Sequence, residues 1–381
     1  MIYLDHNATT PMHPEVLTAM LPYMRGPCGN PASVHHAGRA ARQGMDQARR
    51  QVASLIGVHD SLVCFTSGAT EANNLAISGV GGMQKQPGHA ITSRTEHPSV
   101  LEAFGVLQQQ GHRVTYLDCD SEGRIAPESL QRHLTPDTFL VSIMHANNET
   151  GLIQPIAPLA ALCCEQGVLF HTDIVQSIGR LPWDKEAIAA DLITLSSHKL
   201  GGPMGVGALV MDRSLALTPM IVGGGQERGR RAGTPNVAGI VGFGAAADWL
   251  HKHRQETVAA MTRLRAFLET GLSEKIPGLV IFSHNAPRIA NTTLLGIDGL
   301  HGETLVMNLD LAGFAVSSGS ACASGKGEGS HVLAAMGVPQ SLALSAIRIS
   351  IGWNTQVQQL ERFIHQFAQI VARLQGGATV R

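Results

Sequence analysis

Short hydrophobic runs alternate with amphipathic segments between residues 60 and 212. The runs have the length of buried strands, and they lie at residues 62–66, 89–93, 113–118, 138–146, 168–173, 191–197 and 205–211. Between several of them apolar residues recur at helical spacing, as in ATEANNLAISGV and HPSVLEAFGVLQQQG. This alternation predicts an α/β fold with a mainly parallel sheet of seven strands and helices packed on it.

The last third of the chain has a different pattern of apolar and polar positions. A long helix is expected from Ala245 to Leu272. Strand candidates follow at 280–284, 290–297, 313–318 and 345–352, with helices near 302–313 and from about 355 to 374. We therefore expect a large domain at residues 13–257 and a smaller α/β domain made of residues 1–12 and 258–381.

Composition and charge narrow the class of protein. The 381 residues are 44% hydrophobic and 15% charged, which is an ordinary globular composition. A formal net charge of −1 gives no electrostatic reason to expect nucleic acid or an anionic membrane as a partner. The start, MIYLDHNATTP, lacks the features of a secretory signal, and no apolar run reaches the length of a membrane span. The expected location is cytoplasmic.

The six cysteines form no C-x-x-C pair and no zinc-ligand spacing, so no metal site is expected. Cys64 lies in an apolar run and Cys163–Cys164 in a helical segment, which predicts buried structural thiols. Cys322 differs, because its surroundings, SSGSACASGKGEGSH at 317–331, hold no large aliphatic side chain and several glycines. Such a segment builds no core and is conformationally permissive.

Polar residues follow several predicted strands, where α/β folds bind ligands. Lys199, in SSHKLGG, suits a Schiff-base lysine, although an ordinary loop lysine fits the same pattern. Asp173 ends the run FHTD, and it could hold a protonated pyridinium nitrogen or cap a helix. His97 could cover a flat cofactor ring and shuttle protons, or be structural.

Two further signals concern anions. Residues 68–70 open a helix whose free N–H groups could bind a phosphate, although plain capping also explains them. Arg348 lies within an apolar strand and needs an anionic partner, either a substrate carboxylate or an internal salt bridge. Taken together, the signals describe a phosphate anchor, a pyridinium partner, a histidine over the ring and a Schiff-base lysine.

Several sequence motifs, taken in their order along the chain, resemble those of a known protein family. They are YLDHNATTP, CGNPASVHHAG, FTSGATEANNLAI, TEHPSV, SIMHANNETG, FHTDIVQSIG, SSHKLGGPMGVGAL, GGGQERGRRAGTPN and SSGSACASG. With their spacing, the chain resembles the cysteine desulfurases of the NifS/IscS type, in the class V aminotransferase family. The resemblance implies a fold-type I enzyme that depends on pyridoxal 5'-phosphate and forms a homodimer with active sites at the subunit interface.

The resemblance also implies residue roles. Lys199 would hold the cofactor, His97 would stack on its ring and Asp173 would pair with the ring nitrogen. Gln176 would meet the ring hydroxyl, and Val175 would pack beneath the ring. The positions around the phosphate are Ala69, Thr70, Ser196, His198 and, from the other subunit, Thr234. The residues expected at the substrate carboxylate are Asn148, which also lines the cofactor site, and Arg348.

For Cys322 the resemblance implies the sulfur chemistry. The thiolate would take sulfur from L-cysteine, leave L-alanine, and carry the sulfur as a persulfide on a mobile loop at about 318–330 to an acceptor protein. That acceptor could be an iron–sulfur scaffold, as in iron–sulfur cluster assembly, or a thiolation or other modification enzyme. The chain departs from the family pattern at Ile174, Ser197 and Gly329.

Three alternatives remain open on the sequence. Two are enzymes on the same scaffold, a selenocysteine lyase and an aminotransferase, and an aminotransferase would not need Cys322. The third is a sulfur carrier with a vestigial cofactor site, which the set of Lys199, Asp173 and His97 argues against.

Overall fold

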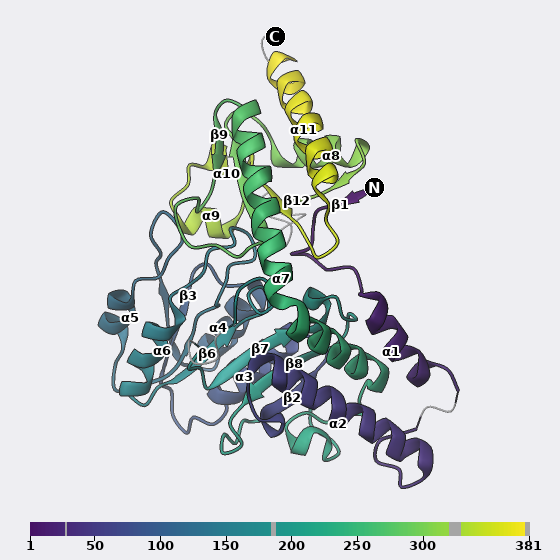
Figure 1. The fold of residues 1–381 in the computed structure, drawn as a ribbon. Coiled ribbons are helices and arrows are strands. Elements are labelled where there is room, and N and C mark those ends of the chain that lie inside the picture. The colour runs from purple at the N-terminus through teal and green to yellow at the C-terminus, as the bar shows by residue number, and fades with distance from the viewer. Residues whose placement is uncertain (27–28, 184–187, 320–328, 378–381) are drawn as a thin grey trace.

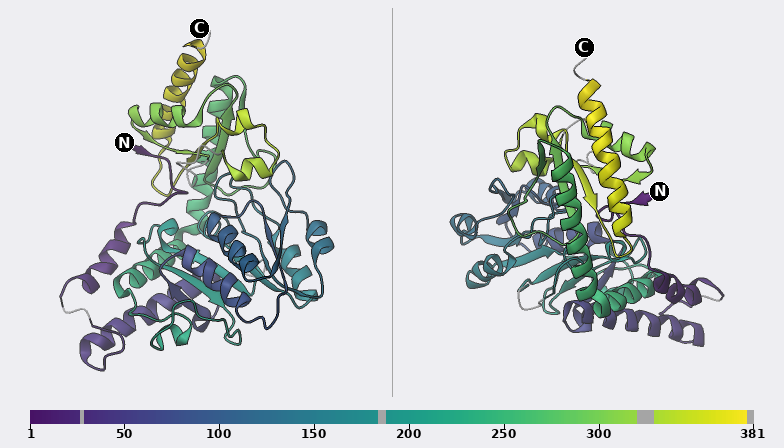
Figure 2. Two further views of the ribbon diagram at one scale, coloured as in Figure 1. Left: turned by 180° about the vertical axis from the view of Figure 1, so that it is seen from behind. Right: turned by 45° about the horizontal axis from the view of Figure 1, so that its top comes forward.

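The computed structural model describes residues 1–26, 29–183, 188–319 and 329–377. It has a larger part built on a central sheet and a smaller part that contains both chain termini (Figures 1 and 2). The long helix α7 (Val237–Lys275) runs from one part into the other (Figure 1). It begins earlier than the sequence predicts, at a cap in which the Asn236 side chain accepts the Gly239 N–H.

The central sheet contains the seven predicted strands in the order β2-β8-β7-β6-β5-β3-β4. Their bounds are β2 (Val63–Thr66), β3 (His89–Ser93), β4 (Arg113–Leu117), β5 (Thr138–Ser142), β6 (Leu169–Asp173), β7 (Leu192–Ser196) and β8 (Gly207–Met211). Only β8 runs antiparallel, to both β2 and β7, while the other neighbours pair in parallel. The prediction of a mainly parallel sheet is confirmed.

Successive side chains on these strands point to opposite faces of the sheet, and they pack into two separate hydrophobic cores. On β7, Ile193 packs with α2 and α7, whereas Leu192 packs with α3 and α4 on the opposite face. Val141 and Leu140 divide in the same way on β5. The helices of this part are α1 (Pro14–Met24), α2 (His36–Ile56), α3 (Ala69–Gly81), α4 (Pro98–Gln109), α5 (Pro127–His133) and α6 (Ile156–Glu165). Helices therefore cover both faces, which leaves the strand ends as the place for a site.

The smaller part has its own sheet and its own core. Its antiparallel sheet has the order β12-β13-β10-β9, and β1 pairs in parallel with β11. The bounds are β1 (Ile2–Tyr3), β9 (Leu279–Ile281), β10 (Thr292–Ile297), β11 (Phe314–Ala315), β12 (Ser317–Ser318), β13 (Ile347–Ser350), α8 (Gly302–Leu311), α9 (His331–Ala335), α10 (Gln340–Ala343) and α11 (Val357–Gly377). Leu4 joins Leu268, Ile349 and Phe363 in its core. This clustering of residues 2–4 with residues beyond 257 supports the two-domain division that we propose.

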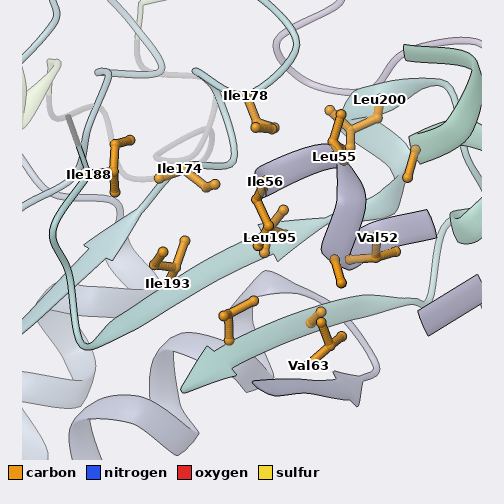
Figure 3. Close-up of a cluster of buried hydrophobic side chains, with 14 of the residues drawn as sticks. Val52, Leu55, Ile56, Val63, Ile174, Ile178, Ile188, Ile193, Leu195 and Leu200 are labelled. Carbon is orange, nitrogen blue, oxygen red and sulfur yellow. The ribbon is translucent and has the colours of Figure 1, made fainter. Parts of the chain in front are cut away.

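Two expectations about apolar residues can be compared with the packing. Cys64 and Cys163 are buried as predicted, but the prediction for Cys164 is wrong, because this residue is exposed. Neighbouring positions on a helix point about 100° apart, so of these two cysteines it is Cys163 that faces the core, with Ile156, Leu159 and Ala160 of α6. Ile174 lies in the hydrophobic cluster with Ile178 and Ile193 rather than in a ligand cavity (Figure 3). No helix in the described ranges is long and apolar enough to cross a membrane.

Candidate active site

A cavity of about 570 Å³ opens at the carboxyl ends of the parallel strands. It brings together residues from the start of α3, the start of α4, the ends of β6 and β7, and strand β13. The sequence-predicted residues that line it are Ala69, Thr70, His97, Asn148, Asp173, Val175, Gln176, Ser196, His198, Lys199 and Arg348. Side chains far apart in the sequence thus converge on one hollow, which is the place where α/β sheets bind ligands.

Lys199 lies in the short helix η2 (Ser197–Leu200), directly after β7. Gly201 follows with φ of 79°, a left-handed conformation that lets the chain turn away at once. The Lys199 Nζ donates to the backbone oxygens of Asn7 at 2.5 Å and Ala8 at 2.7 Å. The N-terminal segment therefore holds the amine at the cavity wall. Ser197, where the family has glycine, has no positive φ and is buried.

A hydrogen-bonded chain connects Asp173 with His97. Asp173 accepts from Asn73 Nδ2 at 2.9 Å and from the Val175 N–H at 2.9 Å. The same Asn73 nitrogen donates to Ser99 Oγ at 2.9 Å, and this hydroxyl lies 2.8 Å from His97 Nδ1. The Ser99 backbone N–H also donates to His97 Nδ1 at 3.1 Å, so Nδ1 is an acceptor and the proton of the neutral ring lies on Nε2.

Electrostatics favour a neutral His97. Burial lowers the pKa of His97, and the positive groups of Lys199 and His331 lower it further, while Asp173 opposes them. The pKa of His198 is lowered to about 4, mainly by burial, with Lys199 and Arg180 adding to the effect. Its Nδ1 lies 3.1 Å from Thr9 Oγ1. Both imidazoles are therefore uncharged at neutral pH.

Another part of the cavity wall is formed by the N-terminus of α3. Gly68 is the capping residue and offers no side-chain hydrogen bond to the first turn. Ala69 and Thr70 thus present backbone N–H groups and the positive end of the helix dipole toward the cavity. Ser196 ends β7 beside them. This set of groups can bind a phosphate.

Arg348 forms an internal salt bridge, which is one of the two roles that the sequence left open, and it also lines the cavity. Its Nη2 lies 2.8 Å from Asp5 Oδ1, and its Nη1 donates to the Asn148 carbonyl at 3.0 Å. A guanidinium has five N–H donors, so these two bonds leave donors for a ligand carboxylate.

Two predicted residues are not among the lining residues of this cavity. Thr234 lies in a separate hollow of about 120 Å³ beside Ser67 and Gly205. Its expected role concerns the other subunit of a dimer, so it remains a prediction. Cys322 lies outside the described residues. The chain before it is described to Gly319, whose N–H donates to the Ala346 oxygen at 3.0 Å. Ser317 pairs with Arg348 between β12 and β13.

Sequence reasoning missed several residues that organise the site, namely Asp5, Asn7, Asn73, Ser99 and Arg180. Asn7 connects the two parts, because its Nδ2 donates to the Asn148 oxygen at 3.0 Å and to Thr292 Oγ1 at 2.8 Å. The available signal was the polar run DHNATT between an apolar pair and the first helix. Asn73 gave a weaker signal, since an asparagine pair on a helix is usually exposed.

The comparisons agree on the kind of protein. Residues 2–363 match the family model for aminotransferase class-V. The chain is 42% identical over 374 residues to cysteine desulfurase 2 of Trichormus variabilis, covering 98% of this chain and 94% of the relative. A solved structure described as a NifS-like protein has a TM-score of 0.91 at 36% identity, covering 97% and 99% of the two chains. Another, described as SspA in complex with cysteine, has a TM-score of 0.83 at 34% identity, covering 92% and 99%.

The fold is that of a class-V aminotransferase-type enzyme, and the chain belongs to that family. Within it, the chain groups with the cysteine desulfurases, as the NifS/IscS resemblance indicates. Membership of this family implies pyridoxal phosphate as the cofactor.

The donor set of the cavity fits that cofactor. An amine, a carboxylate, a neutral imidazole and an open helix N-terminus are the groups that a pyridoxal ring and its phosphate require. Lys199 and Arg348 line this cavity together with the carboxylates of Asp173 and Glu71, and Glu71 is paired with Arg231 at 2.8 Å.

Proposed function

We propose that this chain is a cysteine desulfurase that removes sulfur from L-cysteine, yielding L-alanine and a persulfide on Cys322. The observation that carries the proposal is the convergence of Lys199, Asp173 and a neutral His97 on one cavity that also contains Arg348. The cysteine-bound relative, at 34% identity over most of both chains, supports L-cysteine as the substrate.

Pyridoxal phosphate, when bound, supplies an electron sink for a carbanion. Lys199 would hold it covalently, and Asp173 would accept from its ring nitrogen. Gln176 would meet the ring hydroxyl, and His97 and Val175 would cover the ring. The phosphate would lie at the start of α3, with Ala69, Thr70, Ser196 and His198 around it. This assignment follows the arrangement of the cavity, in which the helix end and Asp173 both line the wall.

The protein groups divide the proton transfers between them. The Lys199 amine, released from the carbonyls of Asn7 and Ala8, would exchange a proton with the substrate α-carbon. His97 Nε2, which carries the ring proton, is the nitrogen left to donate a proton to the substrate, because Ser99 occupies Nδ1. Arg348, with Asn148 beside it, would orient the substrate carboxylate so that the thiol side faces the Cys322 segment.

The sulfur transfer is a nucleophilic displacement at sulfur. The Cys322 thiolate attacks the substrate sulfur, an S–S bond forms, and the bond between that sulfur and the β-carbon breaks. The electron pair of the broken bond stays with the carbon, which takes up a proton and becomes the methyl group of alanine. Cys322 follows Gly319 by three positions, a reach of at most about 10 Å, so the described anchor beside Arg348 allows the approach.

The assembly and the acceptor belong to the same proposal. A homodimer in which Thr234 completes the partner's phosphate site would give two composite sites. The persulfide would pass to an acceptor protein, either an iron–sulfur scaffold or a modification enzyme, in the cytoplasm.

The decisive experiment follows alanine and persulfide together. The wild-type protein with L-cysteine should form alanine and carry a persulfide on the peptide that contains Cys322. Cys322→Ala should still bind L-cysteine, seen as a change in the cofactor absorbance, but should release alanine slower by orders of magnitude. Alanine release at the wild-type rate from Cys322→Ala would refute the mechanism. A large preference for selenocysteine would point to a selenocysteine lyase, and keto-acid formation from ordinary amino acids to an aminotransferase.

A further inference from the structure

Arg180 is a buried cation for which the described residues provide no carboxylate partner. Its side chain is only 5% exposed, and the salt bridges within the described residues do not include it. It donates to the Gln176 backbone oxygen at 3.2 Å, to Gln176 Oε1, and to the His6 oxygen at 3.0 Å. A buried guanidinium paired only with neutral oxygens is costly, which calls for a functional explanation.

The contact with Gln176 decides the orientation of its carboxamide. Arginine has only donors, so the amide atom that faces it must be the oxygen. The Gln176 Nε2 then points the other way, and it donates to the Asn7 oxygen at 3.1 Å on the cavity side. The same Asn7 oxygen receives the Lys199 amine at 2.5 Å. The Gln176 NH₂ and the Lys199 amine therefore converge on one point of the wall.

We infer that Arg180 is a positioning residue that keeps the Gln176 NH₂, and not its oxygen, turned toward the cavity beside Lys199. This inference rests on the proposed function, in which Gln176 meets the ring hydroxyl of the cofactor, taken here in its ionised form. Without Arg180 the amide could rotate and present its oxygen, which would repel that anion. The guanidinium also places a fixed positive charge behind the amide, where it favours the anionic form of the ring oxygen.

Other charged and titratable side chains lie around Arg180 and act on the same region. Lys199 and His198 face it from η2, Arg348 from β13 and His6 from the N-terminal segment. Burial lowers the pKa of Arg180 to about 9, and the nearby Arg348 adds to this effect. Since these neighbours include no carboxylate, loss of Arg180 makes the region less positive and should favour protonation of a cofactor bound at Lys199.

The test is a pH titration of the visible absorbance of the holoenzyme, together with the dissociation constant of pyridoxal phosphate. Arg180→Met should raise the absorbance midpoint by about one pH unit and weaken cofactor retention about tenfold. Arg180→Lys keeps the charge and a donor and should restore most of both values. Arg254→Met is the control, because Arg254 is a half-buried arginine that donates to a backbone oxygen, that of Leu55 at 2.7 Å, and does not line the cavity. Its midpoint should equal the wild-type value.

A second variant covers the case in which Arg180→Met does not fold. Gln176→Glu gives Arg180 a carboxylate partner but removes the amide donor, so it should fold and still raise the midpoint and weaken retention. A wild-type midpoint and retention in a folded Arg180→Met, or in Gln176→Glu if the first variant does not fold, would overturn the inference. A wild-type protein that binds no pyridoxal phosphate would instead refute the proposed function, so the two failures are distinguishable.

Discussion

Two buried clusters of charge, one in the smaller domain and one at the cavity, are arranged in opposite ways. In the smaller domain Arg288 forms a two-bond pair with Glu269, at 2.8 and 2.9 Å, and Thr293 donates to the same carboxylate. At the cavity Arg180 meets only neutral oxygens, and Lys199 donates to the carbonyls of Asn7 and Ala8. The first cluster pairs its buried cation with a carboxylate, whereas Arg180 in the second has no carboxylate partner among the described residues.

This difference separates structural charge from functional charge. Arg288 holds the pKa of Glu269 below its usual range against the opposing effect of burial, so the pair is ionised and satisfied. Burial lowers the pKa of His6 and of His198 to about 4 each, with Arg180 contributing to both shifts. Burial therefore keeps the imidazoles of His6 and His198 neutral, and the nearby cations add to this effect.

The largest effect is expected at the cavity. Lys199→Ala should lower alanine formation by about 10²–10⁴-fold or more, because both the attachment of the cofactor and a proton carrier are lost. Borohydride reduction of the wild-type protein should leave the cofactor on the peptide SSHKLGG, as mass spectrometry can show. The thermal stability of Lys199→Ala should stay near that of the wild-type apoprotein. Attachment of the cofactor at another lysine would contradict the assignment of Lys199 as the functional cation of the cavity.

The structural cluster should respond through stability instead. Glu269→Gln leaves Arg288 buried without its counter-charge, and this should lower the free energy of unfolding by about 3–5 kcal/mol. Urea denaturation measures the loss, and Asp248→Asn, which affects only an exposed pair with Lys252, should cost less than about 0.5 kcal/mol. Equal losses in the two variants would mean that the Glu269 pair is not a structural centre.

The neutral histidines predict an acid-dependent loss of stability. The folded-state pKa of His6, about 4, lies below the unfolded value of 6.5, so its contribution is present above pH 6.5 and is lost as the pH falls toward 4. For one such group this loss is up to about 3 kcal/mol. His6→Leu should therefore show a shallower fall in unfolding free energy between these pH values than wild type. The exposed His251→Leu should follow the wild-type curve, and an unchanged slope in His6→Leu would contradict the prediction.

The smallest effect concerns the pair of Arg348 and Asp5. The Asp5 carboxylate occupies one donor of Arg348 at 2.8 Å and competes with a substrate carboxylate for its charge. Asp5→Asn should lower the KM for L-cysteine about threefold to tenfold, which is about 1 kcal/mol, with little change in kcat. Steady-state kinetics test this. A rise in KM would show that Asp5 orients Arg348 rather than competing for it.

Much of the fold and of the cavity wall follows from the sequence, for reasons of periodicity. Alternation and helical spacing are local properties, so the seven strands and most helices could be predicted from the residues. Asp173 and Lys199 could be predicted as neighbours because parallel strands end at the same edge of a sheet. Boundaries were less certain, as the early start of α7 shows, since tertiary packing extends a helix beyond its clearest repeat.

The tertiary structure alone decided which polar atoms meet. No pattern in the sequence pairs Asn73 with both Asp173 and Ser99, or Asp5 with Arg348, which lies 343 positions away. These contacts depend on where chain segments cross, and hydrogen bonds require positions accurate to tenths of an ångström. The sequence by itself determined the strands, the order of the motifs and the chemical types at the strand ends. Long-range packing determined their protonation, their orientation and the charge that they leave for a ligand.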